Sequence, residues 1–371
     1  RLENMLHVDA GDDFGLLSII GRECAGALSF WPEGESPQDQ EPRYSALSLE
    51  DFQIWREYAQ QQPLRFPGRT IRMSLAGAQA KTALYFDTAG QPFLPEDGAP
   101  TSHILKPRIP GCRPDTAHTE LLTMRLARAV LGDDEVPFTD VWQNCYRIRR
   151  FDRPRGEFGI GRLHQEDFCL ALGRMPAGKY ESAGRPERLW SACFALLDRL
   201  GEQGLLASPA VERLSLLNQV ILNVLLHNPD AHLKNHALLH GGDGSMHVSP
   251  LYDCLCTDGL NFAAKGSAWA PDAGPAAHTR ELSLRIGNAT LIDRVEKSDW
   301  ADFAAECGFT APFVKRRVRA MAEATGDMLK AVTDAVVDDH PPAEPAAQAV
   351  RQAVNTRVTI CLLYTSDAAD V

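Results

Sequence analysis

The stretch Asn228-Pro-Asp-Ala-His-Leu-Lys-Asn235 decides how the chain is interpreted, because it gathers polar side chains directly after the apolar segment 214–226. The spacing of apolar residues in that segment predicts a helix with a buried face. Folding alone does not explain so many polar groups at the end of a buried helix. Asp230 can accept a proton as a general base, and the amide oxygen of Asn235 can bind Mg²⁺. Two further donors for a developing negative charge are His232 and Lys234.

The spacing inside this stretch matches the catalytic loop of protein kinases. In that loop an aspartate accepts the proton of the substrate hydroxyl, and an asparagine five positions later binds a metal ion. A second carboxylate, Asp253, follows the short apolar segment 246–248 and occupies the place of the other metal-binding aspartate, although no Phe-Gly follows it. We therefore predict Asp230 as the base with His232 and Lys234 beside it, and Asn235 and Asp253 as metal ligands.

A loop rich in small residues lies upstream, between two strands predicted within 71–86. Small side chains let backbone N–H groups approach phosphate oxygens closely. The loop is neither a GxGxxG motif nor a Walker A motif, and taken alone a plain hairpin loop is the better explanation of it. Its place before the catalytic stretch favours nucleotide binding, for which we predict Ser74, Ala76, Gly77, Ala78, Gln79, Lys81 and Thr82.

A lysine and a glutamate follow in the order that kinases use. Lys106 ends the short apolar strand predicted at 103–106, where an ammonium can reach the α- and β-phosphates. Glu120 lies fourteen residues later on a helix predicted at 116–131, and kinases pair such a glutamate with the lysine. A solvated lysine and a surface glutamate are the common alternatives, so these two predictions depend on the order of the motifs.

The distribution of expected elements predicts an α+β, bilobed, protein-kinase-like fold. A small strand-rich N-lobe is expected over 66–150 and a larger, mostly helical C-lobe over 151–337. Residues 1–65 contain a helix from Ser48 to about Gln61, introduced by a capping box. The Pro- and Ala-rich range 338–360 is expected to be a linker. Further helices are predicted at 187–203, 212–227, 298–307 and 311–337.

Composition places limits on the class of protein. Hydrophobic residues make up 44% and charged residues 23%, which is ordinary for a soluble globular protein. The net charge of −11 argues against a general nucleic-acid-binding surface. No apolar run approaches the roughly 20 residues of a membrane span. The nine cysteines form no CxxC pair and complete no zinc motif, so we expect reduced thiols in a cytoplasmic protein.

Taken together, the motifs resemble the HipA family, the serine/threonine kinase toxins of HipA–HipB toxin–antitoxin pairs. The resemblance runs in order from about residue 10 to about residue 335. The motifs that support it are Ser-Leu-Ala-Gly-Ala-Gln-x-Lys-Thr-Ala (74–83), His-Ile-Leu-Lys-Pro (103–107), Arg-Phe-Asp-Arg (150–153), Arg-Leu-His-Gln-Glu-Asp-Phe-Cys (162–169), Lys-Tyr-Glu (179–181), the stretch 228–235 and Pro-Leu-Tyr-Asp (250–253).

The resemblance implies a role for individual residues. Ser74 falls on the serine that the family autophosphorylates, Lys106 on the ATP lysine and Glu120 on its partner. Asp230 falls on the base, and Asn235 and Asp253 fall on the metal ligands. The segment from Arg149 to Phe151 falls on the hinge whose backbone binds adenine. Arg149 departs from the family pattern, since an acidic residue is expected there, and this puts side-chain contact with the ribose in doubt.

The resemblance also implies cofactors, partners and a substrate. The cofactors are ATP and Mg²⁺, and the partner is a HipB-like DNA-binding antitoxin, through which alone the chain would meet DNA. The expected substrate is an aminoacyl-tRNA synthetase, such as glutamyl-tRNA synthetase, whose phosphorylation halts translation and is linked to persistence. Two alternatives stay open. One is a kinase of this fold that acts on a small molecule, and the other is a non-catalytic scaffold that binds the antitoxin.

Both ends of the sequence are expected to depart from a complete family member. Residues 1–65 correspond to a remnant of the family's N-terminal subdomain plus a connecting helix. Residues 361–371 resemble the translated end of a transposon used in sequencing libraries, so we expect this tail not to be native.

Overall fold

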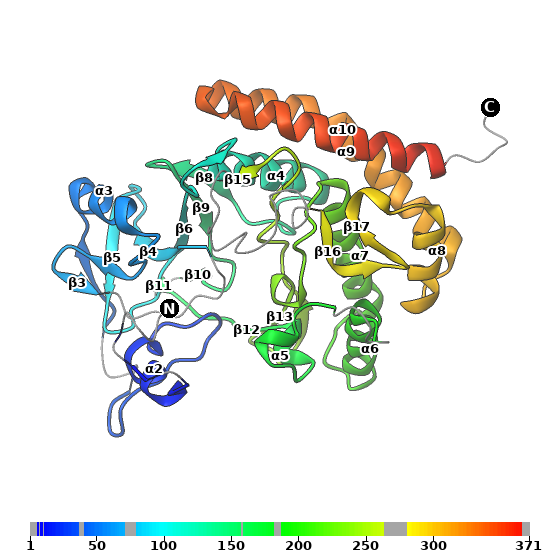
Figure 1. The fold of residues 1–371 in the computed structure, drawn as a ribbon. Helices are drawn as coiled ribbons and strands as arrows, with labels where there is room; N and C mark the ends of the chain where they lie inside the picture. Colours follow the sequence, from blue (N-terminus) through cyan, green and yellow to red (C-terminus); the bar gives the residue numbers. More distant parts are fainter. Residues whose placement is uncertain are drawn as a thin grey trace. The chain divides into compact units, whose positions relative to one another are not determined.

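The computed structural model describes residues 6, 8–9, 11–36, 41–70, 79–156, 159–181, 187–262 and 280–365 (Figure 1). The chain divides into two compact units. Unit 1 comprises residues 1–109 and 138–165, and unit 2 comprises residues 110–137 and 166–371. Strands dominate unit 1 and helices dominate unit 2, so the expected α+β composition is confirmed.

A six-stranded sheet forms the centre of unit 1. Its order is β1-β5-β4-β6-β9-β8, and all of its pairings are antiparallel. The strand predicted around Lys106 is β6, in the middle of the sheet, and Lys106 lies opposite Tyr146 of β9. The bounds are β1 (Arg43–Ala46), β4 (Thr82–Phe86), β5 (Pro92–Glu96), β6 (His103–Pro107), β8 (Thr139–Trp142) and β9 (Cys145–Arg149).

An aromatic cluster joins helix α3 (Leu49–Tyr58) to this sheet. The Ser48 hydroxyl accepts a hydrogen bond from the Asp51 N–H and starts the helix where the capping box predicts. Phe52 and Trp55 are buried, and Phe52 contacts Trp142 of β8 edge-on at 4.6 Å between ring centroids. The smaller elements of unit 1 are α2 (Asp13–Ile20), β2 (Arg65–Phe66), β3 (Arg69–Thr70), β10 (Arg155–Gly156) and β11 (Gly159–Ile160).

Unit 2 is built mainly from helices, and its long helices other than α10 lie at the predicted positions. Its long helices are α4 (Thr116–Leu131), α6 (Leu189–Glu202), α7 (Pro209–Leu225), α8 (Lys297–Glu306), α9 (Ala311–Asp339) and α10 (Glu344–Thr365). The shorter helices are α5 (Phe168–Ala171), η2 (Pro176–Gly178), η3 (Leu233–Asn235), η4 (Ile292–Arg294) and η5 (Pro341–Ala343).

Short strands complete unit 2. One small sheet has the order β12-β13-β14, and β12 is a continuous strand although the division between the units falls after Gln165. The bounds are β7 (Cys112–Arg113), β12 (His164–Asp167), β13 (Ala237–His240), β14 (Met246–Val248), β15 (Asn261–Phe262), β16 (Glu281–Ile286) and β17 (Ala289–Leu291).

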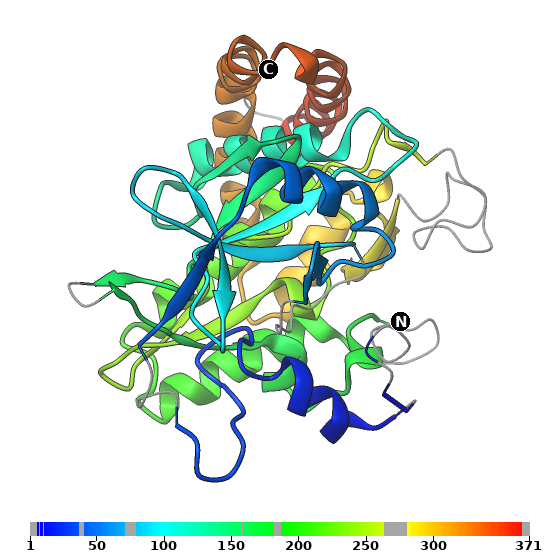
Figure 2. The same ribbon diagram turned by 90° about the vertical axis from the view of Figure 1, so that its left-hand side faces the viewer.

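The prediction of a linker over 338–360 is wrong. Helix α9 continues to Asp339, and after a short turn α10 runs back beside it, as Figures 1 and 2 show. Alanine is the best helix former, and the apolar residues recur at helical spacing. The buried face of α10 includes Ala346, Ala347, Val350 and Val354. Residues 361–365 form the last turn of this helix, and residues 366–371 lie outside the described residues.

Helix α4 also differs from its expected place. The boundaries expected from the sequence put it in the N-lobe, within 66–150, but it belongs to unit 2. The reason is that α4 packs against α9 and α10 and is buried along most of its length, from Thr116 to Ala127. The residues that separate β6 from β8 in the sequence therefore contribute to the core of the other unit.

Candidate active site

The stretch 228–235 begins at a sharp turn after α7. His227 has a φ of +57°, a left-handed backbone conformation that is uncommon outside glycine and often marks functional positions. The side-chain amide of Asn228 donates a hydrogen bond to the side-chain oxygen of Asn223, in the last turns of α7, at 2.7 Å. Asn228 is itself buried. This turn ends the apolar helix and redirects the polar residues that follow it.

Two hydroxyl groups bind the carboxylate of Asp230. The Ser283 hydroxyl of β16 donates to its carboxylate at 3.0 Å, and the Tyr180 hydroxyl hydrogen-bonds the same carboxylate. Burial, followed by the charge of Asp253, raises the pKa of Asp230 to about 6. A carboxylate with a raised pKa accepts a proton more readily than an exposed one, which suits a general base near neutral pH.

The expected metal ligands lie close to this base. The Asn235 amide nitrogen in η3 donates to the Asp230 carbonyl at 2.9 Å, which orients the amide and leaves its oxygen as an acceptor. Asp253 has a φ of +57°, and its charge contributes to the raised pKa of Asp230. A carboxylate and an amide oxygen beside a second carboxylate form the donor set that Mg²⁺ prefers, so these residues fit the expected metal ion.

His232 has a defined tautomer because of Lys179. The Lys179 ammonium lies 2.8 Å from the His232 Nε2 atom, and an ammonium can only donate. Burial, then the charge of Lys179, lowers the pKa of His232 to about 4, so the ring is neutral with its proton on Nδ1. This buried Nδ1 has no hydrogen-bond partner among the residues that the structure describes. Such a donor suits the oxygen of a bound ligand.

Lys234 is held from two sides. Its ammonium forms an ion pair with Asp167 at the end of β12, and its carbonyl accepts a hydrogen bond from the Tyr252 hydroxyl at 2.8 Å. The structure therefore brings together within unit 2 all the catalytic and metal-binding residues predicted from the catalytic stretch and the second aspartate: Asp230, His232, Lys234, Asn235 and Asp253.

The nucleotide residues described in unit 1 lie on or beside its central sheet. Lys106 is only 6% exposed, and its amine lies 5.7 Å from the centre of the Tyr146 ring. The Gln79 amide donates to the Pro107 carbonyl at 3.1 Å, which ties the end of the predicted phosphate loop to β6. Lys81 is half-buried and Thr82 is buried at the start of β4. The other four predicted loop residues lie outside the described residues: Ser74, Ala76, Gly77 and Ala78.

Glu120 is buried in α4 and only 3% exposed. It belongs to unit 2, whereas Lys106 belongs to unit 1, so the pairing of the two side chains stays a prediction. A buried glutamate is rare unless it has a partner, and the alternative of an exposed surface glutamate is therefore wrong for this position.

The predicted adenine hinge leads into a buried ionic network. Arg149 is exposed at the end of β9 and Phe151 is half-buried, so contact of this segment with adenine stays a prediction. The residues after Arg149 have another role in unit 1. Arg150, Arg153 and Asp152 are almost completely buried, and both arginines bind Glu23, at 2.9 and 3.2 Å.

Sequence reasoning gave no role to several residues around Asp230. Lys179 and Tyr180 lie in the Lys-Tyr-Glu motif, and Asp167 lies in the motif 162–169. The sequence therefore marks these residues but does not indicate which side chains they contact. Ser283 lies 53 residues from Asp230 in the sequence, and no local pattern marks it.

Helices that could cross a membrane are absent from the described residues.

Comparisons with known proteins identify related chains. A family model described as the HipA-like C-terminal domain matches residues 73–335. "Putative kinase Y4mE" of Sinorhizobium fredii is 35% identical over 345 residues, which cover 90% of this chain and 75% of that protein. The "Serine/threonine-protein kinase toxin HipA" of Shewanella oneidensis is 30% identical over 277 residues, covering 68% of this chain and 58% of that protein.

A solved structure confirms the fold. The complex of Shewanella oneidensis HipA, HipB and operator DNA contains a chain that matches this one with a TM-score of 0.75 and 22% identity. The match covers 100% of this chain and 83% of that chain. The kinase-like fold predicted from the motifs is therefore that of HipA.

Proposed function

The chain belongs to the HipA-like C-terminal domain family, and from this membership we propose that it is an ATP-dependent serine/threonine protein kinase. The observation that supports the proposal most strongly is the environment of Asp230. Its carboxylate has a raised pKa and lies beside Asn235 and Asp253, in the order and spacing of a kinase catalytic loop.

The described side chains divide the work of phosphoryl transfer. Asp230 accepts the proton of the acceptor hydroxyl, and Ser283 holds the carboxylate in place. Asn235 and Asp253 would hold Mg²⁺, which neutralises phosphate charge when it is bound. His232 donates from Nδ1 to the transferred phosphoryl group, because Lys179 occupies its other nitrogen. Lys106 would bind the α- and β-phosphates, and Glu120 would orient Lys106.

The proposal extends to partners and substrate. One relative is named a kinase toxin, and the matching solved structure contains HipB and operator DNA. These similarities support a HipB-like antitoxin as partner, with DNA contacted through it, and a cytoplasmic role as the toxin of the pair. A protein substrate of the aminoacyl-tRNA synthetase class and autophosphorylation at Ser74 are the finer parts of the same proposal.

One labelling experiment tests the reaction and its acceptor. The chain is incubated with γ-labelled ATP, Mg²⁺ and a cell lysate, and labelled products are separated into proteins and small molecules. Labelled serine or threonine in a protein supports the proposal. Label found only in a small molecule indicates the alternative substrate class, and no transfer at all indicates a non-catalytic scaffold. The Asp230→Asn variant serves as the blank.

Replacing Lys106 is expected to weaken nucleotide binding. Lys106→Met keeps the stem against Tyr146 but removes the charge, and hydrogen bonds to charged groups are worth about 1.5–3 kcal/mol. We expect ATP affinity, measured by calorimetry, to fall about 10- to 100-fold. Lys106→Arg should recover little, because a planar fork does not replace a compact ammonium. The control is Lys330→Met, at a lysine that is 86% exposed. Unchanged affinity in Lys106→Met would show that another cation binds the phosphates.

Phosphorylation of Ser74 is expected to switch the nucleotide site off. A phosphoryl group adds a charge of about −1.5 to −2 and three acceptor oxygens at the predicted phosphate loop. Loop amides that bind this group are lost to ATP, so phosphorylated protein should bind ATP poorly. The chain is incubated with Mg-ATP, its phosphosites are mapped by mass spectrometry, and its ATP affinity is compared with that of Ser74→Ala. Full ATP affinity in protein phosphorylated at Ser74 would contradict the switch and favour the alternative, in which the hydroxyl only caps a turn.

A further inference from the structure

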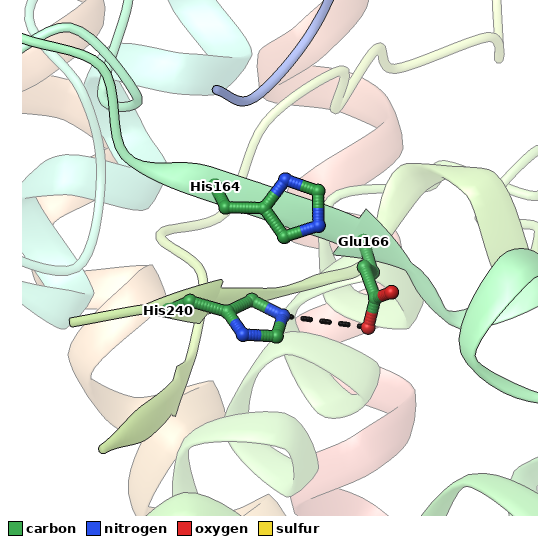
Figure 3. A group of neighbouring side chains, drawn as sticks. All are labelled: His164, Glu166 and His240. Carbon is green, nitrogen blue, oxygen red and sulfur yellow. Dashed lines mark hydrogen bonds and ion pairs between the residues drawn. The ribbon is translucent and has the colours of Figure 1, made fainter. Parts of the chain in front are cut away.

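Three potential metal ligands meet on the small sheet of strands β12, β13 and β14. His164 and Glu166 are two residues apart on β12, and His240 ends the neighbouring strand β13. Side chains alternate along a strand, so residues two apart lie on the same face. Figure 3 shows the two imidazole rings and the carboxylate turned toward one another. One ligand atom from each residue lies within 4.8 Å of the other two.

The geometry is close to that of a metal site. The His240 Nε2 and Glu166 carboxylate atoms are 3.3 Å apart. Ligand atoms of a tetrahedral zinc ion are separated by roughly 3.3 Å, since zinc–nitrogen distances are about 2.0–2.1 Å. Two of the three ligands therefore already have the required separation. The ligand atom of His164 lies within 4.8 Å of both of the others.

The chemistry of the set selects the kind of ion. Two imidazoles and one carboxylate suit zinc and related transition metals, whereas Mg²⁺ and Ca²⁺ prefer sites made only of oxygen atoms. Three protein ligands leave the fourth position of zinc to water. His240 and Glu166 are each about one third exposed, at 33% and 32%, so an ion can reach them from solvent.

The pair of His247 and Glu212 is a histidine–glutamate contact without a third ligand in the described part of the chain, and it serves as a comparison. His247 of β14 lies 3.1 Å from Glu212, much as His240 lies near Glu166. Within the described residues, however, that pair has no third ligand, and only in the group of His164, Glu166 and His240 do three potential ligand atoms lie within 4.8 Å of one another. The third ligand is the feature that turns a surface contact into a chelating site.

We propose that His164, Glu166 and His240 form a zinc-binding site with three protein ligands and one water molecule. The site is separate from the residues that would hold Mg²⁺. Zinc would join β12 to β13 just before Asp167, which pairs with Lys234 and also caps α5 through the Leu170 N–H. The inference does not depend on the proposed kinase activity, and its test measures binding alone.

The test uses the full chain after removal of metal with a chelating resin. Zinc chloride is titrated into the protein by calorimetry in a buffer that contains Mg²⁺, so that the predicted magnesium ligands are occupied. Cobalt chloride is titrated in parallel, and its visible spectrum reports tetrahedral coordination and distinguishes imidazole from thiolate ligands. The variants are Glu166→Gln and His240→Asn, with His247→Asn as the matched control.

We expect the wild-type chain to bind one zinc ion without thiolate absorption in the cobalt spectrum. Glu166→Gln and His240→Asn should each weaken binding at least about tenfold, since even outer-shell changes cost this much. His247→Asn should bind as the wild type does. At the same zinc concentration, zinc should also raise the melting temperature of the wild type by more than that of Glu166→Gln, because stabilisation by a ligand of the folded state grows with its affinity.

Three results would overturn the proposal. They are an absence of zinc binding in the wild type, equal binding in the wild type and both site variants, and equal loss in His247→Asn and His240→Asn. A thiolate spectrum would assign the bound ion to cysteines and would equally refute the site. Should one variant fail to fold, as judged by its melting curve, the other variant and the wild-type cobalt spectrum still decide the outcome.

Discussion

Asp230→Asn is expected to reduce the rate of phosphoryl transfer by about 10²–10⁴-fold, the usual contribution of a general base. The substitution keeps the size of the side chain and a group that can bind Ser283, but it removes the proton acceptor. ATP binding should change little, since Asp230 is expected to act on the acceptor hydroxyl. The measurement is kcat for transfer from labelled ATP, together with ATP affinity by calorimetry.

The same variant should not be less stable than the wild type. Burial and Asp253 raise the pKa of Asp230 to about 6, above its value in the unfolded chain. A carboxyl group with a raised folded-state pKa lowers stability above that pKa, and the effect disappears when pH falls below both values. At pH 7 a neutral asparagine removes this cost. We therefore expect an equal or higher melting temperature at pH 7, with a smaller difference at pH 4.

A matched control separates loss of chemistry from loss of fold. Asp198→Asn makes the same change on α6, at an exposed carboxylate that pairs with the partly buried Arg213. Its activity should stay close to that of the wild type, because Asp198 has no part in the proposed reaction and most surface substitutions change stability by no more than about 0.5 kcal/mol. Near-normal turnover in Asp230→Asn, with the same melting temperature as the wild type, would show that another group accepts the proton.

Glu23→Gln is expected to destabilise the chain by about 3–5 kcal/mol, because it breaks a buried charge network from one side. Glu23 binds Arg150, Arg153 and Arg162, and it also accepts hydrogen bonds from the Thr101 backbone and hydroxyl. When Glu23 loses its charge, Asp152 is the remaining carboxylate that pairs with both Arg150 and Arg153. The measurement is the shift of the urea unfolding curve.

The control for this prediction lies in the same segment of the chain. Glu35→Gln removes a partly exposed ion pair with Arg22, and such pairs are worth about 0–1 kcal/mol. If both variants shift the unfolding curve equally, the buried network does not hold the N-terminal segment to unit 1. A larger shift for Glu23→Gln alone would confirm that the Arg-Phe-Asp-Arg motif stabilises the unit in addition to any role in adenine binding.

Local patterns were sufficient to predict the catalytic stretch. The separation of Asp230 from Asn235 is a short-range property, and the helix before them has a clear apolar period. Helices α4 and α7 were predicted for the same reason. The prediction of Asp253 as a metal ligand depended on the order of several motifs, because a single aspartate in a loop is common. The positions of Ser74 and its neighbours stay predictions.

Tertiary contacts account for what sequence reasoning missed. Ser283 reaches Asp230 only because β16 passes beside the catalytic stretch, and Lys179 meets His232 across 53 residues. Pro341 and Pro342 favour an irregular chain, so the local sequence predicts a linker where α10 forms. The apolar face of α10 indicates a helix only when its contacts with α9 and α4 are known. The family resemblance implies a hinge at 149–151, but no pattern in the sequence marks Glu23 as the partner of Arg150.

The left-handed backbone at Asp253 limits how the site can be dissected by mutagenesis. Asparagine and glycine tolerate a φ of +57°, whereas alanine in this conformation costs about 1–2 kcal/mol. An alanine scan would therefore combine backbone strain with loss of the carboxylate and would overstate the role of this side chain in catalysis. Asp253→Asn isolates the charge and Asp253→Gly isolates the side chain. The same reasoning applies to His227, where asparagine is the informative replacement.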